Sequence, residues 1–167
     1  MINNKFSTKK LVLSALFAAL TFVATYISFP ISLGGYVNLG DCFVILSGLI
    51  LGPFGIASSI VGSCLCDLVI GYAIYIPATA IIKGVMALIV YYFTKTKHSL
   101  PRRLLSSFLA EIVMVSGYLT YEWAFLIGSA AITSVPYNCI QGAVGIISSM
   151  VIYTVLEKTG VIKKIIL

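Results

Sequence analysis

The chain has 167 residues, of which 60% are hydrophobic and only 10% are charged. In soluble domains about a quarter of the residues are charged, so this composition excludes an ordinary soluble domain. It predicts an integral membrane protein with one domain, residues 1–167. The formal net charge of +6 does not indicate nucleic-acid binding, because the basic residues form short clusters between apolar segments and do not alternate with aromatic residues.

Six apolar segments follow one another, separated by glycine, proline or charged residues. We therefore predict an all-α membrane protein with six transmembrane helices, at residues 9–29, 39–51, 54–71, 77–94, 104–130 and 135–157. The first segment exceeds the roughly 7–15 residues of a signal-peptide core and is interpreted as a helix. The second is too short to cross a bilayer of ~30 Å alone, so part of residues 30–40 is expected to fold onto the same end of the bundle.

Lysine and arginine residues indicate the orientation of the helices. Three basic clusters precede the first helix, link the fourth to the fifth and follow the sixth: Lys5, Lys9 and Lys10; Lys95, Lys97, Arg102 and Arg103; Lys158, Lys163 and Lys164. The connecting segments near 30–38, 72–76 and 131–134 contain neither residue type. With six spans, the three clusters lie on one side, and the positive-inside rule predicts that both termini are cytoplasmic.

Polar residues within the apolar segments collect toward the predicted outer end. Ionisable groups inside a membrane mark functional sites by default, because each costs a few kcal/mol to insert. A small polar stripe along the third helix, Ser59, Ser63, Asp67 and Gly71, also reaches this depth. We predict an outward-facing cavity with these ligand-binding residues: Asn38, Asp41, Tyr75, Thr79, Lys83, Tyr118, Glu122, Asn138 and Gln141.

Several of these charged residues also have a structural interpretation. Asp41 either caps the second helix, where a carboxylate gains from the helix dipole, or contacts the ligand. Asp67 and Lys83 lie at a similar depth and are predicted to form a structural ion pair. Glu122 then has no protein cation left, so it is interpreted as a ligand-binding residue.

Some of the other predicted residues can be explained by packing between helices, with no role in ligand binding. Asn138 and Gln141 are alternatively hydrogen-bond donors and acceptors between helices, although their position in the outer turns favours ligand binding. Ala15 and Ala19 are four residues apart and form a small-residue face on the first helix. That face either packs inside the bundle or receives a helix of another subunit.

The sequence shows no catalytic or metal-binding pattern. Cys42, Cys64, Cys66 and Cys139 fall within apolar segments at spacings that suit neither a metal site nor a disulfide framework. His98, the only histidine, lies in a basic loop. We therefore predict no metal, no cofactor and no catalytic residue. An intramembrane enzyme, a structural assembly protein and a stand-alone proton-coupled transporter are the alternatives, and the last of these would be expected to show paired repeat halves.

These features resemble the S component, the substrate-binding membrane subunit, of energy-coupling factor (ECF) vitamin transporters. The resemblance covers nearly the whole chain and rests on Ala15-x-x-x-Ala19 and on four segments: NLGD (38–41), GSCLCDLVIGYAIYIPATAIIKG (62–84), GYLTYE (117–122) and PYNCIQG (136–142). Within the family the chain is most similar to the branch associated with vitamin B6 vitamers and hydroxymethylpyrimidine, the pyrimidine precursor of thiamine. An S component for another vitamin, such as riboflavin, is the alternative.

The resemblance implies binding of a B6 vitamer such as pyridoxine or pyridoxamine, or of hydroxymethylpyrimidine, from outside the cell membrane. It implies docking through Ala15 and Ala19 onto a transmembrane scaffold subunit driven by two ATPase subunits, followed by toppling of the S component in the membrane. The chain has no GxxxxGK[ST] phosphate loop of its own. The first outer loop is expected to act as a lid, in which Asp41 caps the second helix while Asn38 touches the ligand or latches the lid.

Overall fold

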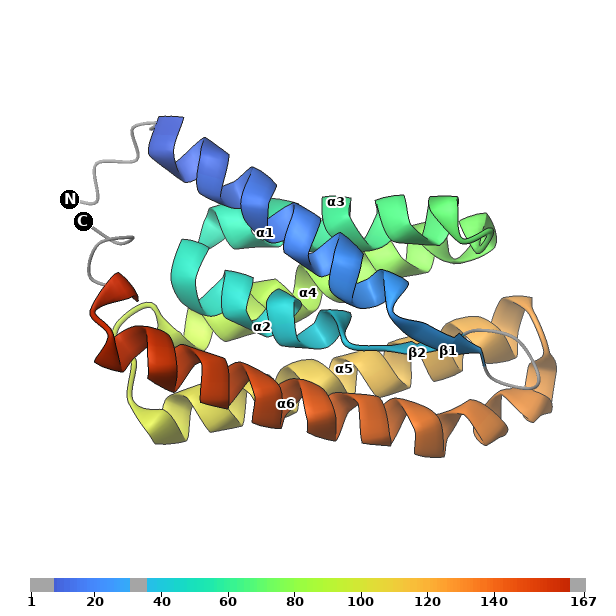
Figure 1. Cartoon of the computed structure of the whole chain (residues 1–167). Helices are drawn as coiled ribbons and strands as arrows, with labels where there is room; N and C mark the ends of the chain where they lie inside the picture. Colours follow the sequence, from blue (N-terminus) through green and yellow to red (C-terminus); the bar gives the residue numbers. More distant parts are fainter. Residues whose placement is uncertain (1–7, 31–35, 163–167) are drawn as a thin grey trace.

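The computed structural model describes residues 8–30 and 36–162. These residues form six α-helices and two short strands: α1 Thr8–Tyr26, β1 Ser28–Pro30, β2 Tyr36–Asn38, α2 Gly40–Leu51, α3 Pro53–Val69, α4 Ile76–Thr94, α5 Leu100–Phe125 and α6 Val135–Lys158. Two 3-10 segments, η1 Ala73–Tyr75 and η2 Gly128–Ser134, lead into α4 and α6. The helices run lengthwise beside one another as a bundle (Figure 1).

Four helical stretches in the described part are long and apolar enough to cross a membrane. They are α1, η1 with α4, α5, and η2 with α6. The helices α2 and α3 have 12 and 17 residues and are shorter apolar helices. A transmembrane position for all six helices therefore stays a prediction.

The short helix α2 lies in the interior of the bundle. It packs against α1, α3, α4 and α6, and every residue from Gly40 to Ile50 is buried except the half-buried Phe43. A Cβ on Gly48 would lie 2.7 Å from the carbonyl oxygen of Ala87, so this glycine permits close contact between α2 and α4. A helix that is apolar on all sides is stabilised by burial among other helices, which explains why α2 does not need the length of the bilayer.

The connections between the helices fall into two groups, one at each end of the bundle (Figure 1). The start of α1, the connection from α4 to α5 and the end of α6 lie at one end, and the strands, η1 and η2 lie at the other. The described basic clusters therefore share one end: Lys9, Lys10, Lys95, Lys97, Arg102, Arg103 and Lys158. The predicted cluster members Lys5, Lys163 and Lys164 lie outside the described residues. A cytoplasmic position for this end stays a prediction based on the charges.

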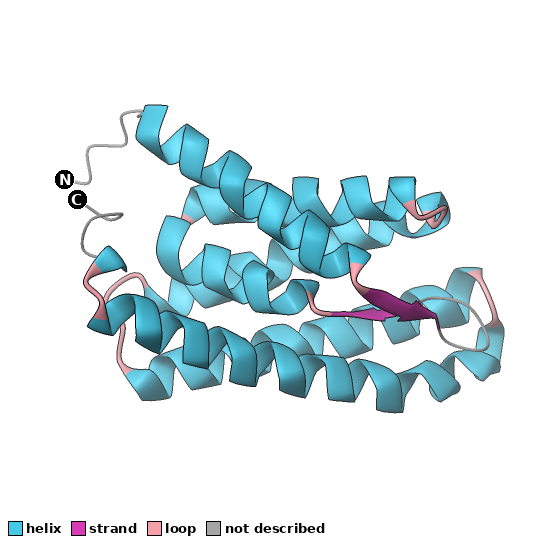
Figure 2. Cartoon of the chain, viewed as in Figure 1, coloured by secondary structure: helices cyan, strands magenta, loops and turns pink. Residues whose placement is uncertain are grey.

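The connections differ from the sequence-based expectation in two places. The first helix ends at Tyr26 instead of residue 29, because Ser28–Pro30 pairs antiparallel with Tyr36–Asn38 in a two-stranded sheet (Figure 2). The fifth helix begins at Leu100, where proline in the first turn is tolerated, and ends at Phe125. Gly128, with a positive φ of 57°, then starts η2. The fold is therefore helical with one small sheet, at the end of the bundle opposite the described basic clusters.

Candidate functional site

A polar cavity lies where β2, η1 and the helix ends near them meet. Its lining residues are Thr25, Tyr36, Asn38, Ser63, Asp67, Tyr75, Thr79, Lys83, Tyr118, Glu122, Asn138 and Gln141. The cavity measures ≈ 30 Å³, whereas pockets that hold a small molecule typically measure about 300–1,000 Å³. Its own side chains therefore fill most of the site, and a ligand requires some of them to move.

The structure gathers nearly all the predicted ligand-binding residues around this one cavity. The exception is Asp41, which is fully buried beside the cavity and bonded to two of the residues that line it. Residues that are distant in sequence meet here because β2 and the adjoining turns of α4, α5 and α6 lie at the same end of the bundle (Figure 1). Whether each residue touches a ligand stays a prediction.

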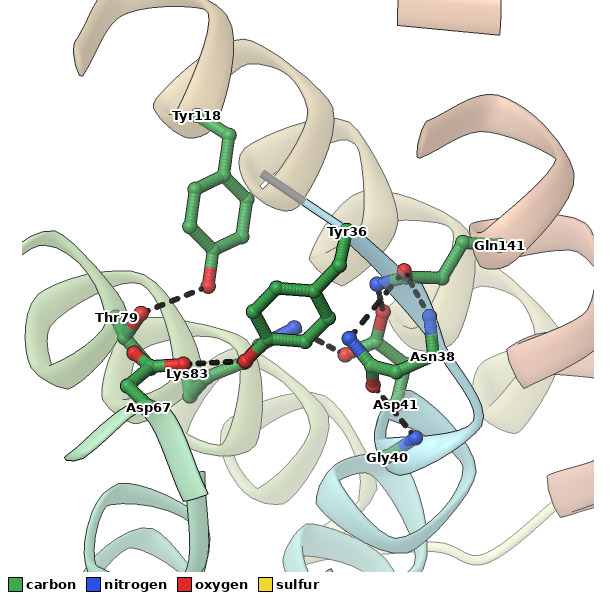
Figure 3. Close-up of polar contacts among 9 residues, drawn as sticks. All are labelled: Tyr36, Asn38, Gly40, Asp41, Asp67, Thr79, Lys83, Tyr118 and Gln141. Atoms are coloured by element: carbon green, nitrogen blue, oxygen red, sulfur yellow. Dashed lines mark hydrogen bonds and ion pairs between the residues drawn. The ribbon is translucent and has the colours of Figure 1, made fainter. Parts of the chain in front are cut away.

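A polar network connects four elements beside the cavity, and Figure 3 shows its contacts. Lys83 on α4 donates to Oδ1 of Asp41 on α2 and forms an ion pair with it. The side-chain amide of Gln141 on α6 donates to Oδ2 of the same carboxylate at 2.5 Å. The backbone N–H of Asn38 on β2 donates to Oε1 of Gln141 at 2.7 Å. The network thus joins the small sheet to the interior of the bundle.

The predicted ion pair between Asp67 and Lys83 is wrong, because Lys83 pairs with Asp41. Depth along a helix places residues at one level, but it does not say which helix face they occupy, and the first turn of the interior helix α2 meets Lys83. The predicted cap is also wrong. The carboxylate of Asp41 is engaged in the network, and the N–H of Gly40 is instead bonded to Oδ1 of Asn38 at 2.8 Å.

Asp67 on α3 is bonded to Tyr36, whose side chain points from β2 toward Asp67 (Figure 3). The Tyr36 hydroxyl donates to Oδ1 of Asp67, and its ring lies edge-on to Tyr72 with 5.0 Å between the ring centroids. Burial, and then the nearby charge of Asp67, raise the pKa of Tyr36 well above its usual value. The phenol therefore keeps its proton and remains a hydrogen-bond donor.

Glu122, the second carboxylate in the lining, is already bonded on both oxygens. Oε1 accepts a hydrogen bond from the Tyr75 hydroxyl at 3.2 Å, and Oε2 accepts one from the Ser134 hydroxyl at 2.6 Å. Since Tyr75 lies in η1 and Ser134 in η2, the carboxylate holds both 3-10 segments against α5. Glu122 is 3% exposed, so these two donors compensate much of the cost of its burial.

Tyrosine rings form an aromatic wall beside the two carboxylates. The Tyr75 ring lies 6.3 Å from that of Tyr118 and 5.9 Å from that of Tyr121. The Tyr118 hydroxyl is 3.1 Å from the Thr79 hydroxyl (Figure 3), and the Lys83 ammonium lies 5.4 Å from the Tyr118 ring centroid. Flat aromatic faces beside hydrogen-bonding groups suit the binding of a small heterocycle.

Four lining residues were not among the predicted ligand-binding residues: Thr25, Tyr36, Ser63 and Asp67. The four-residue spacing of the stripe on α3 was a usable signal for Ser63 and Asp67. No comparable signal was available for Tyr36, because its strand was not predicted. Within residues 8–30 and 36–162, no group of three or more His, Cys, Asp or Glu residues is placed to hold a metal ion.

Comparison with known proteins gives consistent matches along most of the chain. A family model described as the S component of the ECF-type riboflavin transporter matches residues 5–158. A thiamine precursor transporter, HmpT, of Lactococcus lactis subsp. cremoris is 31% identical over 97% of this chain and 95% of its own. An uncharacterized protein of Pyrococcus woesei is 35% identical over 77% of this chain and 88% of its own.

A solved structure has a similar fold. It is that of the S component of a bacterial ECF transporter, with a TM-score of 0.73 and 25% sequence identity. The match covers 90% of this chain and 96% of the other.

Proposed function

Because the chain belongs to the S components of ECF-type transporters, which are multi-pass membrane proteins, we propose that it binds a single-ring nitrogen heterocycle from outside the cell for uptake. The first candidate is hydroxymethylpyrimidine. Similarity to a thiamine precursor transporter over 97% of the chain supports this choice. The proposed role is binding and delivery, without a chemical reaction on the ligand.

The size and polarity of the cavity support a ligand with a single ring. A cavity of ≈ 30 Å³ must expand for any ligand, and the three fused rings of riboflavin would require much more displacement of side chains than one pyrimidine ring. The lining offers two carboxylates, hydroxyl groups and a tyrosine wall, which match a flat ring with several polar substituents. Vitamin B6 compounds also have one ring, but none of the named relatives above supports them, so they rank second.

Two alanines of α1 support the proposed partnership with a transmembrane scaffold subunit and two ATPase subunits. Ala15 and Ala19 are exposed, so the small-residue face that they form is not used for packing in the described part of the bundle. A neighbouring face makes the contact with α3, where a Cβ on Gly62 would lie 2.4 Å from the carbonyl oxygen of Ala18. We propose that Ala15 and Ala19 form the docking face for the scaffold.

The proposed function is tested by calorimetry on the purified protein with hydroxymethylpyrimidine, pyridoxine, pyridoxamine and riboflavin. We expect the tightest binding for hydroxymethylpyrimidine, because its single ring needs the least expansion of the cavity and its polar substituents match the lining. Mass spectrometry of small molecules that co-purify with the protein provides an independent check. Tighter binding of riboflavin, or no binding of any of the four compounds, would contradict the proposal.

Glu122→Gln is expected to weaken binding of hydroxymethylpyrimidine roughly ten- to hundred-fold, as is typical when a charged acceptor is lost from a desolvated site. The amide retains the shape of the side chain, and the Tyr75 and Ser134 hydroxyls can reorient to bond with it. The protein should therefore still fold. Calorimetry measures the affinity and thermal unfolding checks the fold. Unchanged affinity would remove Glu122 from the ligand-binding residues.

A further inference from the structure

Two buried polar atoms in the cavity wall have no hydrogen-bond partner among the residues that the structure describes. They are Oδ2 of Asp67 and Oγ of Ser63. Asp67 is 1% exposed and Ser63 is fully buried. Native proteins rarely leave such atoms unsatisfied, so each instance requires an explanation. Because both residues line the cavity, a ligand is placed to supply the missing hydrogen bonds.

The two residues combine complementary hydrogen-bonding groups. They are four residues apart on α3, so their side chains are neighbours on one helix face. The Ser63 hydroxyl can donate or accept, and ionised Asp67 can only accept. A matching ligand edge therefore presents a donor to Asp67, beside a ring atom that can bond with a hydroxyl.

Other groups in the lining are already engaged. Both oxygens of Glu122 accept hydrogen bonds from hydroxyl groups, and Lys83 is paired with Asp41. Oδ1 of Asp67 accepts from Tyr36, and the Thr79 hydroxyl lies near the same carboxylate (Figure 3). The Tyr36 contact holds the carboxylate in place, and Oδ2 has no hydrogen bond of good geometry in the described part of the chain. Of the two carboxylates in the lining, Asp67 thus offers a ligand an oxygen directly, whereas a ligand reaches Glu122 by displacing the Tyr75 or Ser134 hydroxyl.

We infer that Asp67 and Ser63 form a subsite that recognises an amino group beside a ring nitrogen. The inference rests on the proposed function and assigns residues to the choice of ligand. Oδ2 of Asp67 accepts a hydrogen bond from the amino group, and the Ser63 hydroxyl donates one to the ring nitrogen. Hydroxymethylpyrimidine carries these two groups side by side, whereas the ring of pyridoxine carries no amino group.

Two probes that differ in one substituent test the subsite. One is hydroxymethylpyrimidine, and the other is its analogue with an oxo group in place of the amino group. The analogue places an acceptor opposite Asp67, so the hydrogen bond to Oδ2 is lost, whereas the Ser63 hydroxyl can reorient and accept from the ring N–H. Calorimetry on the full-length wild-type protein should show roughly ten- to hundred-fold tighter binding of the amino compound.

Substitutions in the subsite test the two contacts separately. In Asp67→Asn the amide can donate to the oxo group, so we expect the affinity ratio of the two probes to fall about tenfold or more. Ser63→Ala removes the hydroxyl that bonds with the ring nitrogen or ring N–H and should weaken both probes, which provides a second test if Asp67→Asn does not fold. Glu122→Gln is the matched control, because it replaces the other lining carboxylate and should weaken both probes alike without changing their ratio.

The outcomes separate this inference from the proposed function. A wild-type ratio retained in folded Asp67→Asn, or unchanged affinity for both probes in folded Ser63→Ala, would overturn the subsite while leaving the function intact. Equal affinity of the wild-type protein for both probes would do the same. If the folded wild-type protein bound neither probe, the proposed function would fail and the subsite with it.

Discussion

Lys83→Met is expected to destabilise the protein by about 3–5 kcal/mol, the range found when one partner of a buried ion pair is removed from a soluble protein. Lys83 and Asp41 are 3% and 0% exposed, so solvent cannot compensate the carboxylate that is left. Gln141 still donates to one oxygen of Asp41, but it supplies no positive charge. The free energy of unfolding in detergent micelles measures the effect.

Double variants identify the partner of Lys83. Lys83→Met combined with Asp41→Leu should cost less than the sum of the two single changes, because neither charge then remains unpaired. Some loss should persist, since Gln141 loses its acceptor. Lys83→Met combined with Asp67→Asn is the control, and its losses should nearly add, because only a weaker charge interaction without an ion pair connects these two residues. Additive losses with Asp41→Leu, or strong coupling with Asp67→Asn, would contradict the ion pair seen in the structure.

Ala15→Trp or Ala19→Trp is expected to abolish uptake and leave ligand affinity unchanged. Both alanines are exposed on α1 and lie outside the residues that line the cavity. A tryptophan at either position would hold a second helix away from the small-residue face that close packing requires. Uptake of labelled ligand into cells that contain the complete transporter, compared with calorimetry on the purified chain, measures the two effects separately.

A matched substitution on another helix controls for the added bulk. Ile147 on α6 is 66% exposed, so Ile147→Trp adds a similar apolar side chain to a different surface of the bundle. Uptake should persist in this variant. Full uptake by both alanine variants would remove the docking role from this face of α1, and loss of uptake in Ile147→Trp would show that bulk alone disrupts the assembly.

The helices could be predicted from the sequence because each one is an apolar run that ends at glycine, proline or charge. The limits were accurate for α2, whose predicted range of 39–51 compares with Gly40–Leu51. The small sheet could not be predicted, because strands of three residues are too short for an alternating pattern to show. Its residues Tyr36 and Asn38 nevertheless form part of the cavity wall.

Most residues of the candidate site could be predicted from the sequence, but their ion-pair and hydrogen-bond partners could not. Buried polar residues in apolar helices are unusual, so Thr79, Glu122 and Gln141 could be identified individually. Their partners depend on how each helix is rotated and on which helix lies in the interior, and neither follows from depth along the chain. For this reason Asp67 was predicted as the ion-pair partner of Lys83, whereas α2 places Asp41 beside Lys83.

The order of the network residues along the chain has a consequence for biogenesis. Asp41 precedes Lys83 by 42 residues, and a chain is synthesised from its N-terminus. The carboxylate is therefore already present when α4 enters the membrane, where an unpaired lysine would cost about 2.5–3.5 kcal/mol at mid-depth. Gln141 arrives with α6, the last helix, and connects Asp41 to Asn38. We therefore expect the nascent protein to neutralise its buried lysine early and to complete the candidate cavity only when synthesis of the final helix ends.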